Sequence, residues 1–319
     1  MPAHGARSRL IAALAAAAVL AGCGEDDPGP RSPGTAGSPG TGGALVWALP
    51  ERPEGIDPLA ASSREAQLVT RQIHEPLTES LAEPFGDVGR LQGLAISASG
   101  SAGETIWSFT LREGIRFQDG APFNAAAVAA NAERWRTSAE GRALLPGLFA
   151  ADAPRPDLVR FFLQRPDPDF PELLSRPQTG IVSPRALDSR SGADTRLRRD
   201  LRSGTGPFEL RERGGGGVVV ARNLDWWGTE RGLGPALDQV DFRVIPDPAD
   251  RLALLEAGDI HVAEALGAAQ VREARQDPLL EVLGGGDEAL GIERSVRGIT
   301  SATEIPSLSG VWVTRVGPG

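Results

Sequence analysis

The sequence predicts a mixed α/β protein built from many short strands and short helices. Short apolar runs and alternations of apolar with polar residues recur along the chain, which is typical of strands. Between them lie segments that carry helix start and stop signals. The 40 glycines and 26 prolines among 319 residues indicate many turns, and 40% apolar residues can supply a core. A chain of this length has room for two domains or for one large lobed one.

The expected strands are short apolar or alternating segments. In 105–111, Trp107, Phe109 and Leu111 fall on one face because side chains alternate along a strand. The glycine run 214–217 separates two of the segments as a hairpin. The segments are 44–47, 105–111, 158–163, 208–211, 218–222, 240–245, 279–283 and 311–316.

The first helix is expected to start at a capping box, since Ser62 is followed three residues later by Glu65. Its apolar stripe comprises Val69, Ile73 and Leu77.

Later helices carry similar signals. Asn124 is a predicted N-cap, and Ser183 followed by proline predicts a short helix. Asp247 is a predicted N-cap of a helix that Gly258 ends. A further helix is expected at 268–275.

The charge of the chain limits its partners. The formal net charge is −9, and none of the cations is a lysine. An acidic chain repels phosphate groups, so nucleic acid is not an expected partner.

Cys23 is the single cysteine, so the chain forms no internal disulfide and no thiolate metal cluster. A lone cysteine can be a nucleophile, a metal ligand, a core thiol or an attachment point. Arg7 and Arg9 precede an unbroken apolar stretch at 10–20, which is too short for a permanent membrane span but typical of a secretory signal. The sequence that follows, Leu-Ala-Gly-Cys at 20–23, resembles the lipobox of bacterial lipoproteins.

The lipobox implies a signal peptide at 1–22 and a lipid on the Cys23 sulfur. The alternative is an ordinary signal peptide with an incidental cysteine. A lipid would hold the protein at the extracytoplasmic face of the cell membrane. Residues 23–43 have no large apolar side chain after Cys23 and are expected to form a disordered tether, with a reach on the order of 25 Å.

Several motifs of the body resemble family 5 bacterial extracellular solute-binding proteins, in the same order along the chain. The longest is IWSFTLREGIRFQDGAPFNAAAVAANAERW at 106–135. The others are IDPL at 56–59, IHEPL at 73–77, GTGPFEL at 204–210, RNLDWWG at 222–228 and LDQVDFRVIPDPADRLALLEAGDI at 237–260.

The resemblance implies a type II, cluster C periplasmic-binding-protein fold, with mixed sheets and short helices in a first lobe at 44–265. It also implies a receptor that binds peptides, nickel chelates or similar small polar solutes and docks on an ABC permease. The resemblance fades near residue 264. We therefore expect 266–319 to be a short tail in place of most of the second lobe, with 311–316 as a last strand at the edge of the first lobe.

The resemblance also implies ligand contacts at two places. The first is the start of the first helix, with Ser62, Ser63 and Gln67; the alternative role of Ser62 is the helix cap. The second is the segment that contains Thr205 and Gly206. Trp226 and Trp227 are expected to pack in the core, with ligand stacking as the alternative interpretation.

Enzyme signatures are missing from the sequence. The three histidines (His4, His74 and His261) have no metal-ligand spacing, and no G-x-S-x-G motif occurs. We expect His74 to be a partly exposed structural residue. The glycine run lacks the lysine of a P-loop. The chain is therefore expected to use no cofactor, no metal and no catalytic residue.

An arginine cluster at 196–202 is interpreted as a solvated helix face, with partner docking as the alternative.

Two functions remain open on the sequence. The first is a lipid-anchored substrate-binding protein of an ABC importer. The second is a one-lobed lipoprotein that does not transport and serves as an interaction module or is vestigial. In the second case the open half of the cleft is expected to seek a partner, such as a second copy in a homodimer.

Overall fold

The computed structural model describes residues 42–79, 93–187, 203–231, 235, 237–283 and 312–315. The chain divides into two units, Met1–Ser38 and Pro39–Gly319, and all described residues belong to the second. The predictions for the signal peptide, Cys23 and the arginine cluster lie outside the described residues. Among the described helices, none has the length and apolar character needed to cross a membrane.

A seven-stranded sheet has the order β10-β11-β9-β1-β8-β7-β6. The central strand β1 runs parallel to both β8 and β9, and the remaining pairs are antiparallel. The strands are β1 (Ala44–Leu49), β6 (Phe208–Gly214), β7 (Gly217–Arg222), β8 (Gln239–Val244), β9 (Val262–Glu264), β10 (Leu280–Leu283) and β11 (Trp312–Arg315).

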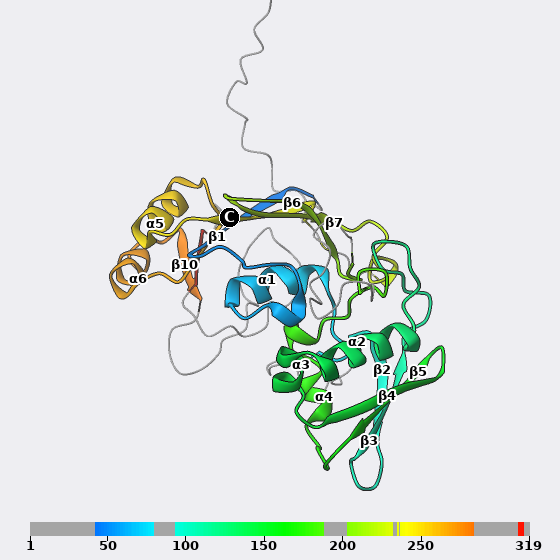
Figure 1. Ribbon diagram of the computed structural model, residues 1–319. Coiled ribbons are helices and arrows are strands. Elements are labelled where there is room, and N and C mark those ends of the chain that lie inside the picture. Colours follow the sequence, from blue (N-terminus) through cyan, green and yellow to red (C-terminus); the bar gives the residue numbers. More distant parts are fainter. Residues whose placement is uncertain are drawn as a thin grey trace, which may run out of the picture. The chain divides into compact units, whose positions relative to one another are not determined.

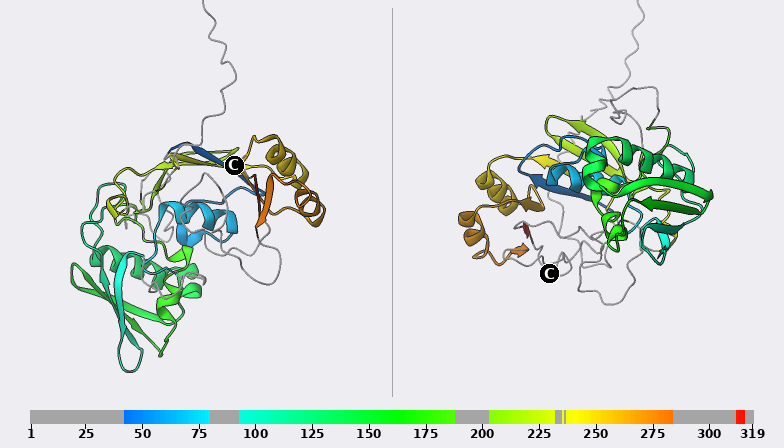
Figure 2. Two further views of the ribbon diagram at one scale, coloured as in Figure 1. Left: turned by 180° about the vertical axis from the view of Figure 1, so that it is seen from behind. Right: turned by 60° about the horizontal axis from the view of Figure 1, so that its bottom comes forward.

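Helices cover both faces of this sheet (Figure 1). Along β1, Leu45, Trp47 and Leu49 pack in the same cluster as apolar residues of α1 (Arg64–Ile73). The alternate residues, Val46 and Ala48, pack with α5 (Pro248–Ala257) and α6 (Ala268–Ala274). Burial on both faces explains why the start of β1 is a continuous apolar run. Figure 2 shows α5 and α6 side by side from two further directions.

A second, antiparallel sheet has the order β2-β3-β5-β4. Its strands are β2 (Ala95–Gly100), β3 (Ile106–Leu111), β4 (Leu148–Arg155) and β5 (Leu158–Leu163). The helix α2 (Ala125–Thr137) packs on it, and Phe109 and Phe161 meet edge to face in the shared core, with their ring centroids 5.5 Å apart. Shorter helical segments complete this part: α3 (Ala139–Leu144), α4 (Phe170–Leu173) and the 3₁₀ turns η1 (Pro58–Ala60), η2 (Pro177–Thr179) and η3 (Thr229–Arg231).

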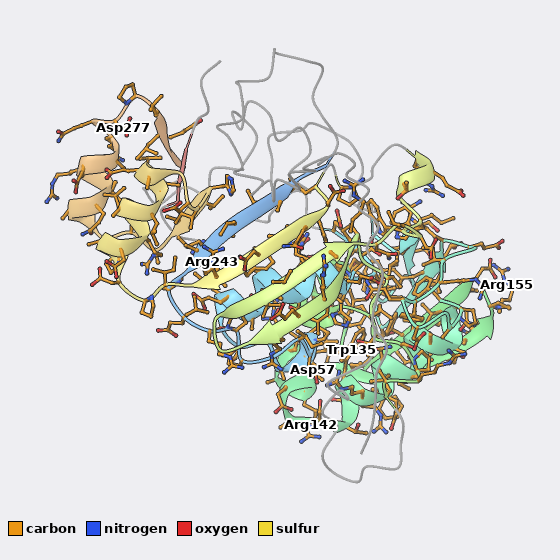
Figure 3. All side chains as sticks on the ribbon, turned by 90° about the horizontal axis from the view of Figure 1, so that it is seen from above. Asp57, Trp135, Arg142, Arg155, Arg243 and Asp277 are labelled. Carbon is orange, nitrogen blue, oxygen red and sulfur yellow. The ribbon has the colours of Figure 1, made fainter. Side chains whose placement is uncertain are left out.

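The chain passes between the two sheets twice, once after α1 and once between β5 and β6. The two crossing segments are hydrogen-bonded to each other, from Ile181 N to Glu75 O (2.9 Å) and from Gly206 N to Ile73 O (2.8 Å). Asp57, the N-cap of η1, also forms an ion pair with Arg134 on α2. Figure 3 labels Asp57 and Trp135, the residue that follows Arg134.

Most of the predicted elements are confirmed. Asn124 caps α2 by accepting a hydrogen bond from Ala127 N (3.0 Å). Asp247 caps α5, and Gly258 ends it in the left-handed conformation with φ 85°. The hairpin between β6 and β7 and the strands near the C-terminus also form.

Several predictions were wrong in detail. The N-cap of α1 is Ser63 rather than Ser62, because the Ser63 hydroxyl accepts the hydrogen bond from Ala66 N (3.2 Å). This helix ends at Ile73, so Leu77 is buried but lies beyond it. The segment after Ser183 forms a turn within the described residues.

The last predicted strand, now β11, does not lie at the sheet edge. It pairs on one side with β9 and on the other with β10, so β10 is the outer strand. This position depends on pairing with distant strands, which residues 311–316 alone do not specify.

Candidate functional site

The helix α1 separates the predicted ligand residues into two groups. Ser62 and Ser63 precede its first turn, and Gln67 lies on the same end of the helix. Thr205 and Gly206 lie at the other end, where Gly206 N binds the carbonyl of Ile73. Ten helical residues span about 15 Å at 1.5 Å per residue, so the five residues do not form one cluster.

The residues at the start of α1 converge on Glu54. Its two carboxylate oxygens accept hydrogen bonds from the hydroxyls of Ser62 (3.0 Å) and Ser63 (2.8 Å). Glu54 is exposed, and although slight desolvation raises its pKa, the hydrogen bonds from the two hydroxyls outweigh this and hold the pKa below its ordinary value. The Gln67 amide donates to the carbonyl of Ala61 (3.2 Å). Glu54, Ser62, Ser63 and Gln67 form one polar cluster, in which the serines bind the Glu54 carboxylate and Gln67 binds the backbone of the same loop.

This cluster lies at the carboxyl end of the parallel strands. The loop with Glu54 follows β1, and Glu264 is the last residue of β9. In open sheets with parallel strands, ligands bind at this edge, where strand order reverses around a central strand. Arg64, the first residue of α1, approaches the Glu264 carboxylate with Nη2 3.6 Å from Oε1.

Glu264 is a buried acid, with only 1% of its surface exposed. Burial raises its pKa to about 7, although Arg64 and the indole of Trp47 lower it. Its charge therefore changes close to neutral pH, unlike that of an ordinary surface glutamate. Arg64 is 23% exposed, so the pair has a buried acidic member and a partly accessible basic one.

A buried arginine organises the same edge. Arg251, on α5, is 2% exposed and donates hydrogen bonds to four backbone carbonyls. Two of them, Ile245 and Pro246, follow β8, and the other two, Glu264 and Ala265, are the end of β9 and the next residue. Ala265 has φ 51°, an uncommon conformation for a residue with a Cβ. Arg251 thus stabilises the backbone where the chain leaves the sheet.

The second group, at the end of α1, is tightly packed. Thr205 and Gly206 are buried, and the carbonyl of Gly206 accepts hydrogen bonds from the side-chain amides of Asn223 (2.9 Å) and Gln118 (3.3 Å). A Cβ at the preceding Gly204 would lie 1.8 Å from the carbonyl oxygen of Ile73. Close packing of backbone on backbone therefore explains the glycines of this motif.

Glu75 is a site residue that the sequence interpretation missed. It is 7% exposed, and its carboxylate accepts hydrogen bonds from the indoles of Trp226 (3.2 Å to Oε1) and Trp227 (2.9 Å to Oε2). Burial raises the pKa of Glu75 to about 7, against the hydrogen bonds of Trp227, Thr205 and Trp226, and the charge of Glu79 raises it further. The sequence feature that could have identified Glu75 is an acidic residue among apolar ones directly after a helix, in IHEPL at 73–77.

The expected packing role of the two tryptophans is confirmed, and their indoles also donate hydrogen bonds to Glu75. Trp226 is buried, and Trp227 packs against the core of the second sheet. The guanidinium of Arg112 lies 4.8 Å from the Trp227 ring centroid, and that of Arg231 lies 5.3 Å from it.

His74 is fully buried, so the expectation of partial exposure was wrong. It caps the end of α1, where the segment containing Ser203 covers it, and its Nε2 lies 2.9 Å from the Ser203 hydroxyl. Burial lowers its pKa to about 3, so the imidazole is neutral at ordinary pH. A serine–histidine pair can be catalytic, but both residues are sealed from solvent and this base is very weak, so the pair is structural.

His261 also has a backbone role, since its Nδ1 accepts a hydrogen bond from Val46 N (2.9 Å). Within the described part of the chain, no three His, Cys, Asp or Glu side chains are grouped as metal ligands.

Comparison with curated proteins gives relatives among periplasmic binding proteins. The probable D,D-dipeptide-binding periplasmic protein DdpA of Escherichia coli K12 is 29% identical over 244 residues, which are 75% of this chain and 46% of DdpA. The glutathione-binding protein GsiB of the same strain is 31% identical over 215 residues, 65% of this chain and 39% of GsiB. The chain thus spans less than half the length of these two relatives.

Solved structures show the same fold. The periplasmic binding protein DppA from Helicobacter pylori, in complex with the peptide STSA, has a TM-score of 0.65 at 22% identity, covering 76% of this chain and 51% of its own. NikA from Brucella suis, in complex with Fe(III)-EDTA, has a TM-score of 0.65 at 26% identity, covering 75% of this chain and 48% of its own. The α/β architecture with mixed sheets is therefore that of type II periplasmic binding proteins.

The sequence also matches a family model. Residues 91–303, more than half of the chain, match the bacterial extracellular solute-binding proteins, family 5 Middle. The protein belongs to family 5 of the bacterial extracellular solute-binding proteins.

Proposed function

We propose that this protein is a lipid-anchored, extracytoplasmic substrate-binding protein of an ABC importer, and that it binds a peptide or a similar small polar solute. The observation that carries the proposal is found at the carboxyl end of β1 and β9. There the polar cluster directly precedes Arg64, the first residue of α1, and Arg64 pairs with Glu264. The relatives support this solute class, because DdpA is described as binding D,D-dipeptides and GsiB as binding glutathione.

The chemistry of the cluster suits a solute carboxylate. The guanidinium of Arg64 carries a positive charge, and the helix dipole adds a partial positive charge at the N-terminus of α1. The hydroxyls of Ser62 and Ser63 already bind one carboxylate, that of Glu54. A solute carboxylate that displaces Glu54 would meet the same two donors, with Gln67 as a third polar group.

The proposal retains three of the five predicted ligand residues. Ser62, Ser63 and Gln67 belong to the polar cluster. Thr205 and Gly206 are assigned to packing, because both are buried against the end of α1.

The finer parts of the proposal concern location and partners. The lipid on Cys23 would hold the protein on the membrane, and the tether at 23–43 would let the body reach an ABC permease. Replacing Cys23 with alanine tests the anchor. The variant is expected to leave the membrane fraction, and continued membrane association would exclude Cys23 as the attachment point.

Solute binding is tested on the chain from residue 23, with serine at position 23 to prevent lipidation. Because a ligand that binds only the folded state raises the melting temperature, we expect some peptides of a di- to pentapeptide library to stabilise the protein. Arg64→Gln should abolish this shift. Arg155→Gln, which changes an exposed arginine of the second sheet, should not. A shift that survives Arg64→Gln would place the solute elsewhere.

A second candidate function is a one-lobed lipoprotein that does not transport and acts as an interaction module. Apolar side chains that a partner could cover are Ile96 (51% exposed), Ile106 (36%) and Phe149 (62%), each on a different strand of the second sheet. A stable homodimer in sedimentation experiments, together with no thermal shift across the library, would support this function over solute delivery.

A further inference from the structure

Glu75 lies where three separate parts of the chain meet. The Glu75 junction consists of Glu75 itself, Thr205 from the second crossing segment, and Trp226 and Trp227 from the turn after β7. The backbone carbonyl of Glu75 also binds Ile181 N (2.9 Å). The side chain of Glu75 therefore ties a turn of the seven-stranded sheet to the segment that leads to the other sheet.

The protonation of Glu75 alters these bonds because of the donors that surround it. An indole N–H only donates, and a carboxylate only accepts, so both tryptophans bind the ionised form well. Hydrogen bonds to a charged acceptor are about twice as strong as those to a neutral one. A protonated oxygen accepts less well and needs an acceptor of its own. The Thr205 hydroxyl can take either role because it rotates.

Within the described part of the chain, the charged groups that interact with the junction are Glu79, Arg112 and Arg231. Glu79 lies on the same segment and opposes ionisation of Glu75. Arg112, which follows β3, and Arg231, in η3, stack on Trp227. Burial and the charge of Arg231 lower the pKa of Arg112, against the charges of Glu75 and Glu79. The neighbouring His74 is buried and stays neutral above acidic pH.

We propose that Glu75 is a proton-responsive contact between the two sheets: ionised, it binds both indoles of the Trp226–Trp227 turn, and protonated, it weakens that binding. The contact joins Trp227, which packs against the second sheet, to the end of α1 on the first. Because burial raises the pKa of Glu75 to about 7, its carboxyl group gains or loses its proton close to neutral pH. The proposal is independent of the proposed solute site, which lies at the opposite end of α1.

The test observes the indole N–H groups directly by nitrogen–proton NMR, between pH 5 and pH 9. The chain has six tryptophans, so the six indole signals can be assigned with single tryptophan-to-phenylalanine variants. The signals of Trp226 and Trp227 are expected to move downfield together as pH rises, with a midpoint near pH 7. Glu75→Gln should abolish both movements.

Two further variants sharpen the test. Glu264→Gln removes a second buried acid whose pKa is also raised to about 7, and it should leave the titration of Trp226 and Trp227 unchanged. Trp227→Phe removes the donor to Oε2, so the midpoint sensed by Trp226 should move to higher pH. The proposal is overturned if the two assigned signals do not move between pH 5 and pH 9 in the wild-type protein. It is also overturned if they still titrate in Glu75→Gln.

Discussion

The guanidinium of Arg251 binds the backbone carbonyl of Glu264 through a 2.9 Å hydrogen bond from Nε. The same guanidinium reaches the carbonyls that follow β8, so one side chain on α5 joins the ends of two strands that flank β1. The side chain of Glu264 meets Arg64 at the start of α1. Backbone support and the charged pair of the proposed solute site therefore converge on one residue of β9.

Replacing Arg251 with methionine should destabilise the protein strongly. Four backbone carbonyls would lose the guanidinium as donor, and the side chain that supplies it is 2% exposed. Since a hydrogen bond to a charged group contributes about 1.5–3 kcal/mol, we expect a loss of at least that size. Urea unfolding followed by tryptophan fluorescence measures the loss. Arg272→Met, on the exposed face of α6, is the matched control and should change stability by less than about 0.5 kcal/mol. Similar losses for both variants would mean that the Arg251 hydrogen bonds add little.

The cap of α1 can be tested with two neighbouring serines. Ser63→Ala removes the hydrogen bond to Ala66 N and should cost about 1 kcal/mol of unfolding free energy. Ser62→Ala should cost clearly less. Both variants lose one hydroxyl contact to Glu54, so their difference isolates the cap. A larger loss for Ser62→Ala in urea unfolding would restore the capping box expected from the sequence.

Gly204→Ala should be poorly tolerated because its Cβ would collide with the carbonyl of Ile73. Overpacking of this kind costs about 1–3 kcal/mol or more, and here the obstacle is backbone that cannot rotate away. Gly216→Ala is the control, since a Cβ in this hairpin turn meets nothing within 4 Å. Melting temperatures of both variants measure the difference, and an equal, small effect at the two positions would contradict the close packing.

The pH dependence of stability should reveal the buried acid at position 264. Its folded pKa of about 7 lies above the 4.5 of an ordinary glutamate. The folded state therefore holds the proton more tightly than the unfolded state, and this contribution to stability is present below pH 4.5 and lost as pH rises through 7. The loss amounts to about 3 kcal/mol. Glu264→Gln carries no charge and should avoid this loss.

The measurement is the urea midpoint of wild type and variant at pH 5 and pH 8. The advantage of Glu264→Gln should be larger at pH 8 than at pH 5. Glu256→Gln, on the exposed face of α5, should follow the wild type at both pH values. A Glu264→Gln variant with the same pH dependence as wild type would show that Glu264 ionises as an ordinary surface acid does.

Much of the fold followed from local patterns in the sequence. The alternation of Phe109 and Leu111 predicted β3, and Asn124 and Asp247 predicted the starts of α2 and α5. These signals are readable because side-chain alternation, capping and turn formation depend on residues close together in the chain. The ordered motifs pointed to the family for a related reason, since they mark the loops and caps that such elements require.

The tertiary structure decided which polar residues are buried and which of them meet. Glu75 and Glu264 look like ordinary acids in the sequence, yet packing by distant segments removes both from water and raises the pKa of each to about 7. The pairing of β11 between β9 and β10 likewise depends on partners far along the chain. The sequence by itself determined the elements and the family. Long-range burial decided the partners of each charge, because desolvation depends on everything that surrounds a group rather than on its neighbours in sequence.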